Sequence, residues 1–166
     1  MKDKKFIILI ILSTLIIMFG GVYFLSGTSS GTSQIAASVN AKASFGQTDY
    51  DWGKIKYSGE KATKSFVIKN TGTEILKLYN IKTSCHCTKA HLTVDDIDGP
   101  EFEMGGNSPW VGEIKPGQDG KLTIVFDQTY HGLQGVGYVA RYTSVETNDP
   151  AHSKITFTTS GTVVND

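Results

Sequence analysis

Two cysteines, Cys85 and Cys87, are the residues of this sequence best suited to chemistry, and a single histidine, His86, separates them. No other cysteine occurs among the 166 residues. If the segment is extended, both thiols point to the same face, and a rise of about 3.3 Å per residue places the two Cα atoms slightly less than about 7 Å apart. This spacing leaves three outcomes open: a local disulfide near the upper limit of bridging geometry, a pair of thiolates that binds a soft metal, or two free thiols.

A metal site would need further ligands, because two thiolates rarely hold zinc on their own. Two thiolates and an imidazole suit copper(I) or zinc, and a thioether could be added. The candidates for these additional ligands are His86, His91, His131 and Met104. On an extended strand, however, His86 points away from both sulfur atoms. We therefore expect copper(I) or zinc binding only as the alternative to a structural cysteine pair.

The chain that positions these cysteines begins with an apolar stretch. Residues 6–25 contain no charged side chain, and a helix of this length rises about 30 Å, the thickness of the hydrocarbon core of a bilayer. The sequence therefore predicts one transmembrane helix. Three lysines precede it and no lysine or arginine follows until Lys42, so the positive-inside rule places residues 1–5 in the cytoplasm and the rest of the chain outside.

A cleaved signal peptide is the competing interpretation of this stretch. The apolar core of a signal peptide usually has about 7–15 residues and is followed closely by a cleavage site with small residues. The apolar run here is longer, and small-residue sites such as Val39-Asn40-Ala41 lie well beyond it. A retained anchor in the cell membrane is therefore the favoured interpretation.

Residues 26–43 are rich in Gly, Ser and Thr, which is typical of a flexible linker. Residues 44–166 are long enough for one packed domain. Outside the cytoplasm two cysteines can be oxidised, although a domain of this size needs no disulfide in order to fold. A structural thiol pair or local disulfide that fixes the end of a strand is therefore the leading interpretation. Redox exchange ranks lower, because no thioredoxin-like βαβ pattern surrounds the pair.

The exported domain has the pattern of an all-β protein. In residues 63–69, Phe66 and Ile68 alternate with polar side chains and so share one face of a strand. Residues 75–83 form the next predicted strand, with an irregularity around Asn80, and the cysteines follow at its end. Further strands are predicted at 121–126, 138–146 and 154–164. Short alternating strands separated by turns indicate an immunoglobulin-like β-sandwich of about seven strands.

Several motifs occur in order through this domain. They are Tyr50-Asp51-Trp52-Gly53-Lys54-Ile55, Gly59-Glu60, Phe66-Val67-Ile68-Lys69-Asn70-Thr71-Gly72, Ser84-Cys85-His86-Cys87-Thr88, Pro116-Gly117 and Thr147-Asn148-Asp149-Pro150. Over residues 50–164 the chain resembles the bacterial "domain of unknown function 1573" family, which is similar to the Hydin and major-sperm-protein class of immunoglobulin-like modules. The resemblance implies an exported β-sandwich, frequently anchored to or secreted across the bacterial membrane, and it does not imply an enzyme. The family usually has glycine between the cysteines, and His86 adopts a positive φ less readily than glycine, which disfavours a tight disulfide turn.

Charge and composition argue against some classes of function. The 16 basic and 16 acidic residues give a formal net charge of zero, and the exported domain has no basic stripe, which argues against nucleic acid as a partner. No serine or cysteine nucleophile can be paired with His131 from the sequence, so we expect no enzyme. We expect a membrane-anchored, extracytoplasmic module that binds an envelope protein by strand addition at a sheet edge or through its loops. A copper- or zinc-binding accessory domain is the alternative.

Overall fold

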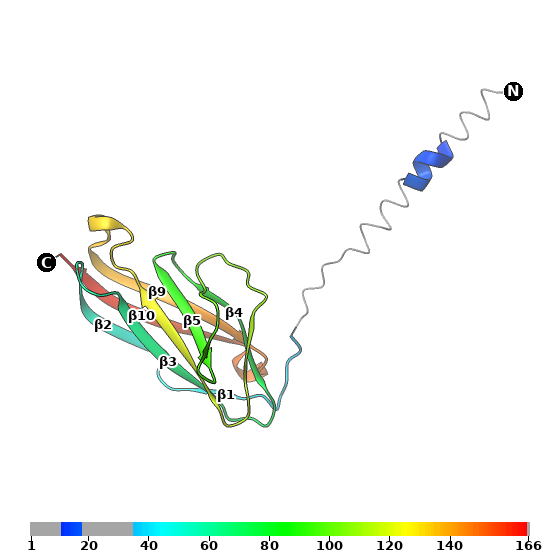
Figure 1. The fold of residues 1–166 in the computed structure, drawn as a ribbon, viewed down its shortest axis with the longest axis horizontal. Coiled ribbons are helices and arrows are strands. Elements are labelled where there is room, and N and C mark those ends of the chain that lie inside the picture. Colours follow the sequence, from blue (N-terminus) through cyan, green and yellow to red (C-terminus); the bar gives the residue numbers. More distant parts are fainter. Residues whose placement is uncertain (1–10, 18–34, 166) are drawn as a thin grey trace. The chain divides into compact units, whose positions relative to one another are not determined.

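The computed structural model describes residues 11–17 and 35–165 (Figure 1). The chain divides into two compact units, Met1–Ile35 and Ala36–Asp166.

The predicted transmembrane anchor lies largely outside the described residues. Of residues 6–25, the structure describes 11–17, which are helical. The predicted cytoplasmic residues 1–5 and the linker residues 26–34 also lie outside the described part of the chain. Among the helices in the described residues, none is both long and apolar enough to span a membrane. The anchor therefore stays a prediction.

The second unit is a β-sandwich of two five-stranded sheets. One sheet has the order β1 (Ala43–Phe45), β3 (Ala62–Asn70), β8 (Asp119–Phe126), β5 (Thr88–Val94) and β6 (Ile97–Asp98). The other has the order β2 (Asp49–Lys56), β10 (Lys154–Val164), β9 (Gly137–Thr147), β4 (Leu76–Thr83) and β7 (Val111–Ile114). Neighbouring strands are antiparallel except for the parallel pair β2 and β10. The predicted immunoglobulin-like β-sandwich is confirmed.

The described chain has ten strands, whereas the sequence predicts about seven. The difference comes from the edge strands β1, β6 and β7, which have only two to four residues. A strand this short contains too few residues for an alternating pattern to stand out.

The core lies between the two sheets and follows the alternation seen in the sequence. Phe66 and Ile68 of β3 are 5% and 0% exposed, while Val67 between them is 54% exposed. The ring centroid of Phe66 lies 4.7 Å from that of Phe157 in the opposite sheet. A second, smaller cluster of buried side chains contains Cys87. The sequence thus predicts correctly which face of β3 is buried.

Residues 36–43, which the sequence assigns to the linker, belong to the compact unit. Ala41 and Ala43 are buried in its core. Gly72 permits the close approach of this segment, since a Cβ at that position would clash with the carbonyl oxygen of Asn40. The folded domain therefore begins earlier than the sequence indicates.

A buried asparagine closes the end of the sandwich where β3 ends. Asn70 is 0% exposed. Its Nδ2 donates to the carbonyl oxygens of Glu74 (2.7 Å) and Ile114 (2.8 Å), and its Oδ1 accepts from the backbone N–H of Gly72 (2.9 Å). One side chain thus satisfies three backbone groups from two separate turns.

The motif Thr147-Asn148-Asp149-Pro150, which leads from β9 to β10, adds further hydrogen bonds at this end. The amide of Asn148 accepts from the backbone N–H of Lys77 (2.8 Å) and donates to the carbonyl oxygen of Ile75 (3.1 Å). The carboxylate of Asp149 accepts from the backbone N–H of Ala43 (3.0 Å). This turn therefore ties β1 and β4 to the end of β9.

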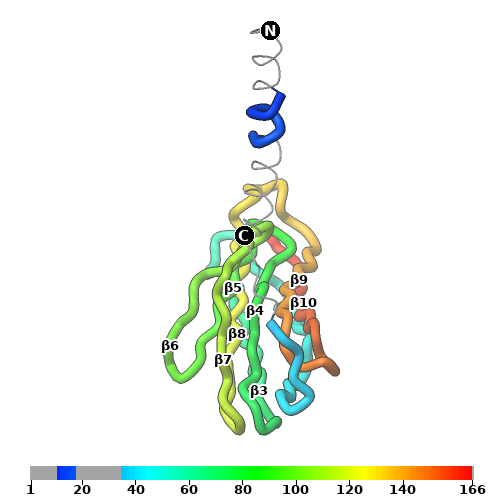
Figure 2. Tube along the Cα trace, turned by 90° about the vertical axis from the view of Figure 1, so that its right-hand side faces the viewer, coloured from blue at the N-terminus to red at the C-terminus, as the bar shows by residue number. Residues whose placement is uncertain are grey.

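The opposite end of the sandwich carries the cysteines. Thr88, at the start of β5, pairs with Phe126, at the end of β8. The chain between β8 and β9, yellow to orange in Figure 2, lies at this end. The turn between β7 and β8 lies at the other end, where the backbone N–H of Gly117 donates to the carbonyl oxygen of Asn70.

Replacing Asn70 by alanine is expected to lower the free energy of unfolding by about 2–4 kcal/mol, because the buried carbonyl group of Ile114 and the part-buried one of Glu74 lose their donor. Asn107 is the matched control, since its exposed amide accepts one hydrogen bond from Lys82 Nζ, and Asn107→Ala should cost less than about 0.5 kcal/mol. Urea denaturation of a fragment comprising residues 36–166 measures both values. Equal losses in the two variants would contradict the role assigned to Asn70.

Candidate functional site

Cys85 and Cys87 lie in the turn between β4 and β5 and are joined as a disulfide. Their Cα atoms are 5.2 Å apart, which is closer than an extended segment would allow, because the backbone N–H of Thr88 donates back to the carbonyl oxygen of Cys85 over 3.0 Å. The hydroxyl of Thr83 lies within hydrogen-bond distance of that same carbonyl oxygen. His86 is not among the described residues with positive φ. The turn thus closes without the backbone conformation that would favour glycine.

An irregularity in β4 orients the chain that enters this turn. Asn80 has a φ of 49°, and the pairing of β4 with β9 shifts register between Tyr79 and Lys82. After this shift Thr83 is buried, where its hydroxyl can hold the turn. The predicted irregularity around Asn80 is confirmed.

The two sulfur atoms have different surroundings. Cys87 is 1% exposed, whereas Cys85 is half-buried. Arg141 Nε donates a hydrogen bond of 3.1 Å to Cys87 Sγ, and His131 Nε2 lies 3.6 Å from Cys85 Sγ. The buried sulfur therefore has a cation beside it, and the more exposed sulfur has an imidazole.

Arg141 reaches the cysteine turn from β9. Its Cζ lies 5.5 Å from the ring centroid of Phe126, and its Nη1 donates to the carbonyl oxygen of Ala140 over 2.9 Å. Burial lowers the pKa of Arg141 from its ordinary value, yet a guanidinium stays charged at neutral pH because its ordinary pKa lies far above neutrality. These contacts hold a permanent positive charge next to Cys87.

His131 reaches the cysteines from the loop before the short 3-10 helix η1 (Gly132–Gly135). Asp127 fixes the start of this loop, because its carboxylate accepts from the backbone N–H of Thr129 (3.0 Å) and forms an ion pair of 2.8 Å with Lys61. The hydrogen bonds from Lys61 and Thr129 hold the pKa of Asp127 below its ordinary value. The loop between β8 and β9 thus positions one of the candidate ligands.

Cys85, Cys87 and His131 form a group whose potential ligand atoms all lie within 4.8 Å of one another. No other histidine of the described residues belongs to this group. The structure therefore brings together both cysteines and one of the predicted additional ligands.

The other predicted ligands have different positions. His86 points to Glu103, with 3.9 Å between its Nδ1 and the carboxylate. His91 is half-buried in β5, where it pairs with Thr123 of β8. Met104 is exposed in the loop that precedes β7.

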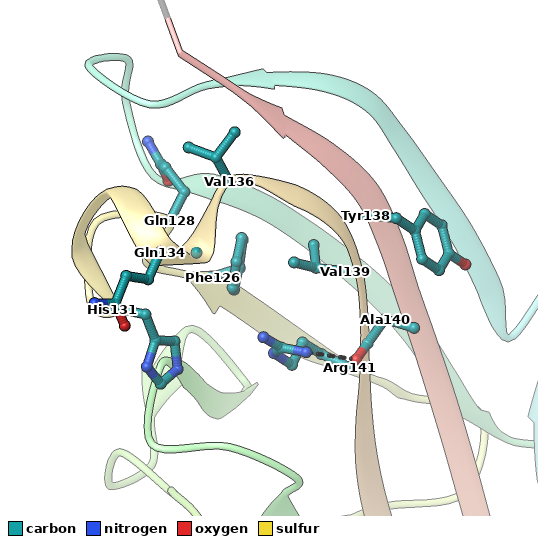
Figure 3. A pocket seen from close by; sticks show the side chains of 10 residues that line it. Phe126, Gln128, His131, Gln134, Val136, Tyr138, Val139, Ala140 and Arg141 are labelled. Carbon is teal, nitrogen blue, oxygen red and sulfur yellow. Dashed lines mark hydrogen bonds between the residues drawn. The ribbon is translucent and has the colours of Figure 1, made fainter.

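A pocket of about 420 Å³ lies at this end of the sandwich (Figure 3). Its lining includes Phe126, Gln128, His131, Val139 and Arg141. Arg141 and His131 lie on the same side of the pocket, and the two come from different elements. The candidate metal ligand His131 and the cation beside Cys87 thus share one cavity.

Gln128 holds the neighbouring loop and lines the pocket. Its Nε2 donates to the carbonyl oxygens of Lys56 (3.2 Å), Gly59 (2.9 Å) and Glu60 (3.1 Å). Its Oε1 is buried and has no hydrogen-bond partner among the described residues. The side chain therefore fixes the loop between β2 and β3 and keeps one acceptor unused.

Large apolar side chains are exposed around the pocket and the cysteine turn. They are Tyr130, Leu133, Val136, Tyr138 and Tyr142, and each is between 40% and 75% exposed. We call this set the apolar rim. Its first three members come from the chain between β8 and β9, and the last two from β9.

Two residues of the site, Arg141 and Gln128, were not predicted from the sequence. Arg141 is the only arginine in the chain, and it occupies an inward position of a strand between Val139 and Thr143, where a charged side chain is rare. That combination is a signal that could have identified it. No local signal marks Gln128, because its role depends on a loop distant in the sequence.

Solved structures share the fold at low sequence identity. A protein of unknown function from Porphyromonas gingivalis W83 is 22% identical, with a TM-score of 0.57, over 78% of this chain and 50% of that chain. A family 123 glycoside hydrolase from Clostridium perfringens is 13% identical, with a TM-score of 0.50, over 76% of this chain and 27% of that chain. The aligned part of this chain thus spans half or less of each, and identities this low show the fold alone.

The first part of the domain matches a family model. No curated protein matches the chain. Residues 43–101, which include both cysteines, match the model of the family described as "Protein of unknown function (DUF1573)". The resemblance indicated by the ordered motifs is therefore confirmed, and the chain carries at residues 43–101 the sequence pattern of the DUF1573 family.

Proposed function

We propose that the domain is a protein-interaction module of the cell envelope, which binds a partner protein through the apolar rim and turns over no small-molecule substrate. The observation that carries this proposal is the exposure of five large apolar side chains along the chain between β8 and β9 and the first half of β9. Exposed large apolar side chains that lie near one another in the chain can mark a site of protein interaction. Three of the five are tyrosines, which are enriched at interfaces because the ring packs while the hydroxyl forms hydrogen bonds.

Buried side chains and a side-chain hydrogen bond order the part of the sandwich beneath the apolar rim. Phe126 and Val139 are buried beneath this end of the sandwich, and Gln128 ties the loop between β2 and β3 to the chain after β8. A surface that is already ordered loses less conformational entropy when it binds. The adjacent pocket offers room for an anchoring side chain of the partner.

Strand addition at a sheet edge has less support than binding through the apolar rim. The edge strands β1, β6 and β7 have two to four residues. The remaining edge, β2, contains Gly53 with a φ of 69°, close to a register shift in its pairing with β10. Short or irregular edges resist pairing with another chain.

Membrane anchoring is the second part of the proposal, with residues 6–25 as a single span of the cell membrane and the domain outside the cytoplasm. The uncharged apolar run and the three lysines before it support this orientation. The disulfide between Cys85 and Cys87 is also consistent with an oxidising compartment.

A copper(I)- or zinc-binding accessory domain is the second candidate function. The grouping of Cys85, Cys87 and His131 favours it, since two thiolates and an imidazole suit both metals. The ligands must be thiolates, so the disulfide would have to be reduced before a metal binds.

A photo-crosslinking amino acid in place of Leu133 or Tyr138 is expected to capture the same partner protein in cells, since both positions belong to the apolar rim. Ile97 on β6, which is 73% exposed, is the matched control and should capture none. Leu133→Asp should abolish the adduct formed at Tyr138, because the interface would bury an unpaired charge. The same adduct at Ile97, or no adduct at either rim position, would contradict the proposal.

Copper(I) titration of the reduced full chain is expected to give about one equivalent that depends on the cysteines. The double variant Cys85→Ser/Cys87→Ser should bind none, and His131→Ala should weaken binding by at least about tenfold. His91→Ala is the matched control and should leave binding unchanged. If elemental analysis finds no stoichiometric, cysteine-dependent metal under reducing conditions, this candidate function fails.

Cell fractionation is expected to recover the chain with the membranes after an alkaline wash, because an apolar span inserts stably. A variant that lacks residues 6–25 should leave the membrane fraction. N-terminal sequencing of the membrane-bound protein checks that the span is retained. A mature protein that begins after Ala41 would show cleavage instead.

A further inference from the structure

We propose that Cys85 and Cys87 form a thiol–disulfide exchange site that acts on a cysteine pair of a partner protein. This inference goes beyond the proposed function, because it assigns chemistry to the disulfide rather than binding alone. It rests on that function in one respect, since the apolar rim would bring the partner's cysteines to the turn.

A purely structural role explains this disulfide poorly. The stabilisation that a disulfide provides increases with the length of the loop that it closes, because a longer loop has more freedom in the unfolded chain. Cys85 and Cys87 are only two positions apart, so their bond removes little of that freedom. Meanwhile the domain already has an extensive core between its sheets.

The different burial of the two sulfur atoms suits exchange chemistry. Cys85 is half-buried at the surface of the turn, and Cys87 is 1% exposed. An incoming thiolate can therefore reach Cys85 Sγ, whereas the protein shields Cys87 Sγ. Attack at Cys85 makes the Cys87 sulfur the leaving group.

Arg141 is placed to stabilise that leaving group. Its Nε–H already points at Cys87 Sγ over 3.1 Å, and hydrogen bonds to a charged acceptor are stronger than those to a neutral one. The stack on Phe126 and the hydrogen bond from Nη1 to Ala140 hold the guanidinium in this position. A thiolate on Cys87 would thus form in a place that is ready for negative charge.

The exchange proceeds in two balanced steps. A thiolate of the partner attacks Cys85 Sγ, the bond between Cys85 and Cys87 breaks, and its electron pair leaves on Cys87. The partner's second thiolate then attacks the partner sulfur of this mixed disulfide and releases Cys85. His131 Nε2 lies 3.6 Å from Cys85 Sγ, so the imidazole is next to the sulfur that is released. The partner's two cysteines end as a disulfide, and Cys85 and Cys87 end as the reduced pair.

Single-cysteine variants of the full chain in mild detergent test the predicted asymmetry. In Cys87→Ser the remaining Cys85 is expected to react with an aromatic disulfide reagent at least about tenfold faster than the remaining Cys87 does in Cys85→Ser, because thiol reactivity depends on access. Equal rates would overturn the proposal. Thermal denaturation of both variants verifies that each is folded.

Arg141→Met tests the stabilised leaving group in the intact disulfide. Reduction by dithiothreitol, followed by alkylation and mass measurement, is expected to be at least about tenfold slower than in the wild type. Lys89→Met is the matched control, since this lysine pairs with Glu103 and should reduce at the wild-type rate. An unchanged rate in Arg141→Met would overturn the proposal.

Trapping in cells separates this inference from the interaction proposal. In Cys87→Ser the free Cys85 thiolate should attack the oxidised cysteine pair of the partner, the reverse of the second step, and accumulate a mixed disulfide that dithiothreitol releases. The buried Cys87 of Cys85→Ser should form none. Crosslinks at Leu133 without any cysteine asymmetry would leave binding intact and refute exchange. A mixed disulfide in Cys87→Ser, together with slower reduction of Arg141→Met but without crosslinks at Leu133, would support the exchange chemistry and refute binding through the apolar rim. If Cys87→Ser forms no mixed disulfide, exchange with a partner protein is refuted.

Discussion

Buried amide side chains decide how the two ends of this sandwich are built, because loop carbonyl groups that are removed from water need donors. At one end Asn70 uses both polar atoms of its amide, toward two carbonyl oxygens and one backbone N–H. At the other end Gln128 directs its nitrogen to three carbonyl oxygens, while its buried oxygen has no partner among the described residues. The first end is therefore closed by its own hydrogen bonds. The second keeps a buried acceptor beside a pocket.

Contacts between the two sheets create the chemistry of the second end. Phe126 ends β8 in one sheet, and Arg141 comes from β9 in the other. The guanidinium lies over the Phe126 ring and donates to Cys87 in the turn before β5. A partly buried guanidinium that lost its acceptor would be costly. The packing of the sheets and the environment of the sulfur are therefore coupled through one side chain.

Local sequence pattern predicts most of the fold and part of the site. Alternation places Phe66 and Ile68 inward, and the cysteine motif follows the end of a strand, as the structure shows. His131 was one of four candidate additional ligands. Only the fold shows which of them lies beside the cysteines, because its loop follows β8 whereas the cysteine turn lies between β4 and β5. The contact between Cys87 and Arg141 joins positions 54 residues apart. A contact of that kind leaves no periodic signal in the sequence, although a lone arginine on an inward strand position is unusual.

The charge of Arg141 also bears on the choice among the chemistries proposed for the two sulfur atoms. A reduced and deprotonated pair would place two negative charges beside one guanidinium. Copper(I) bound by both thiolates leaves one net negative charge for Arg141 to offset, whereas zinc bound by both leaves none. If the reduced pair binds a metal, the guanidinium therefore favours copper(I) over zinc. Since the same contact would stabilise Cys87 as a leaving thiolate, the proposed metal binding and the proposed disulfide exchange would use one arrangement of side chains. They require opposite oxidation states of the cysteine pair, and a metal-bound pair cannot be attacked as a disulfide.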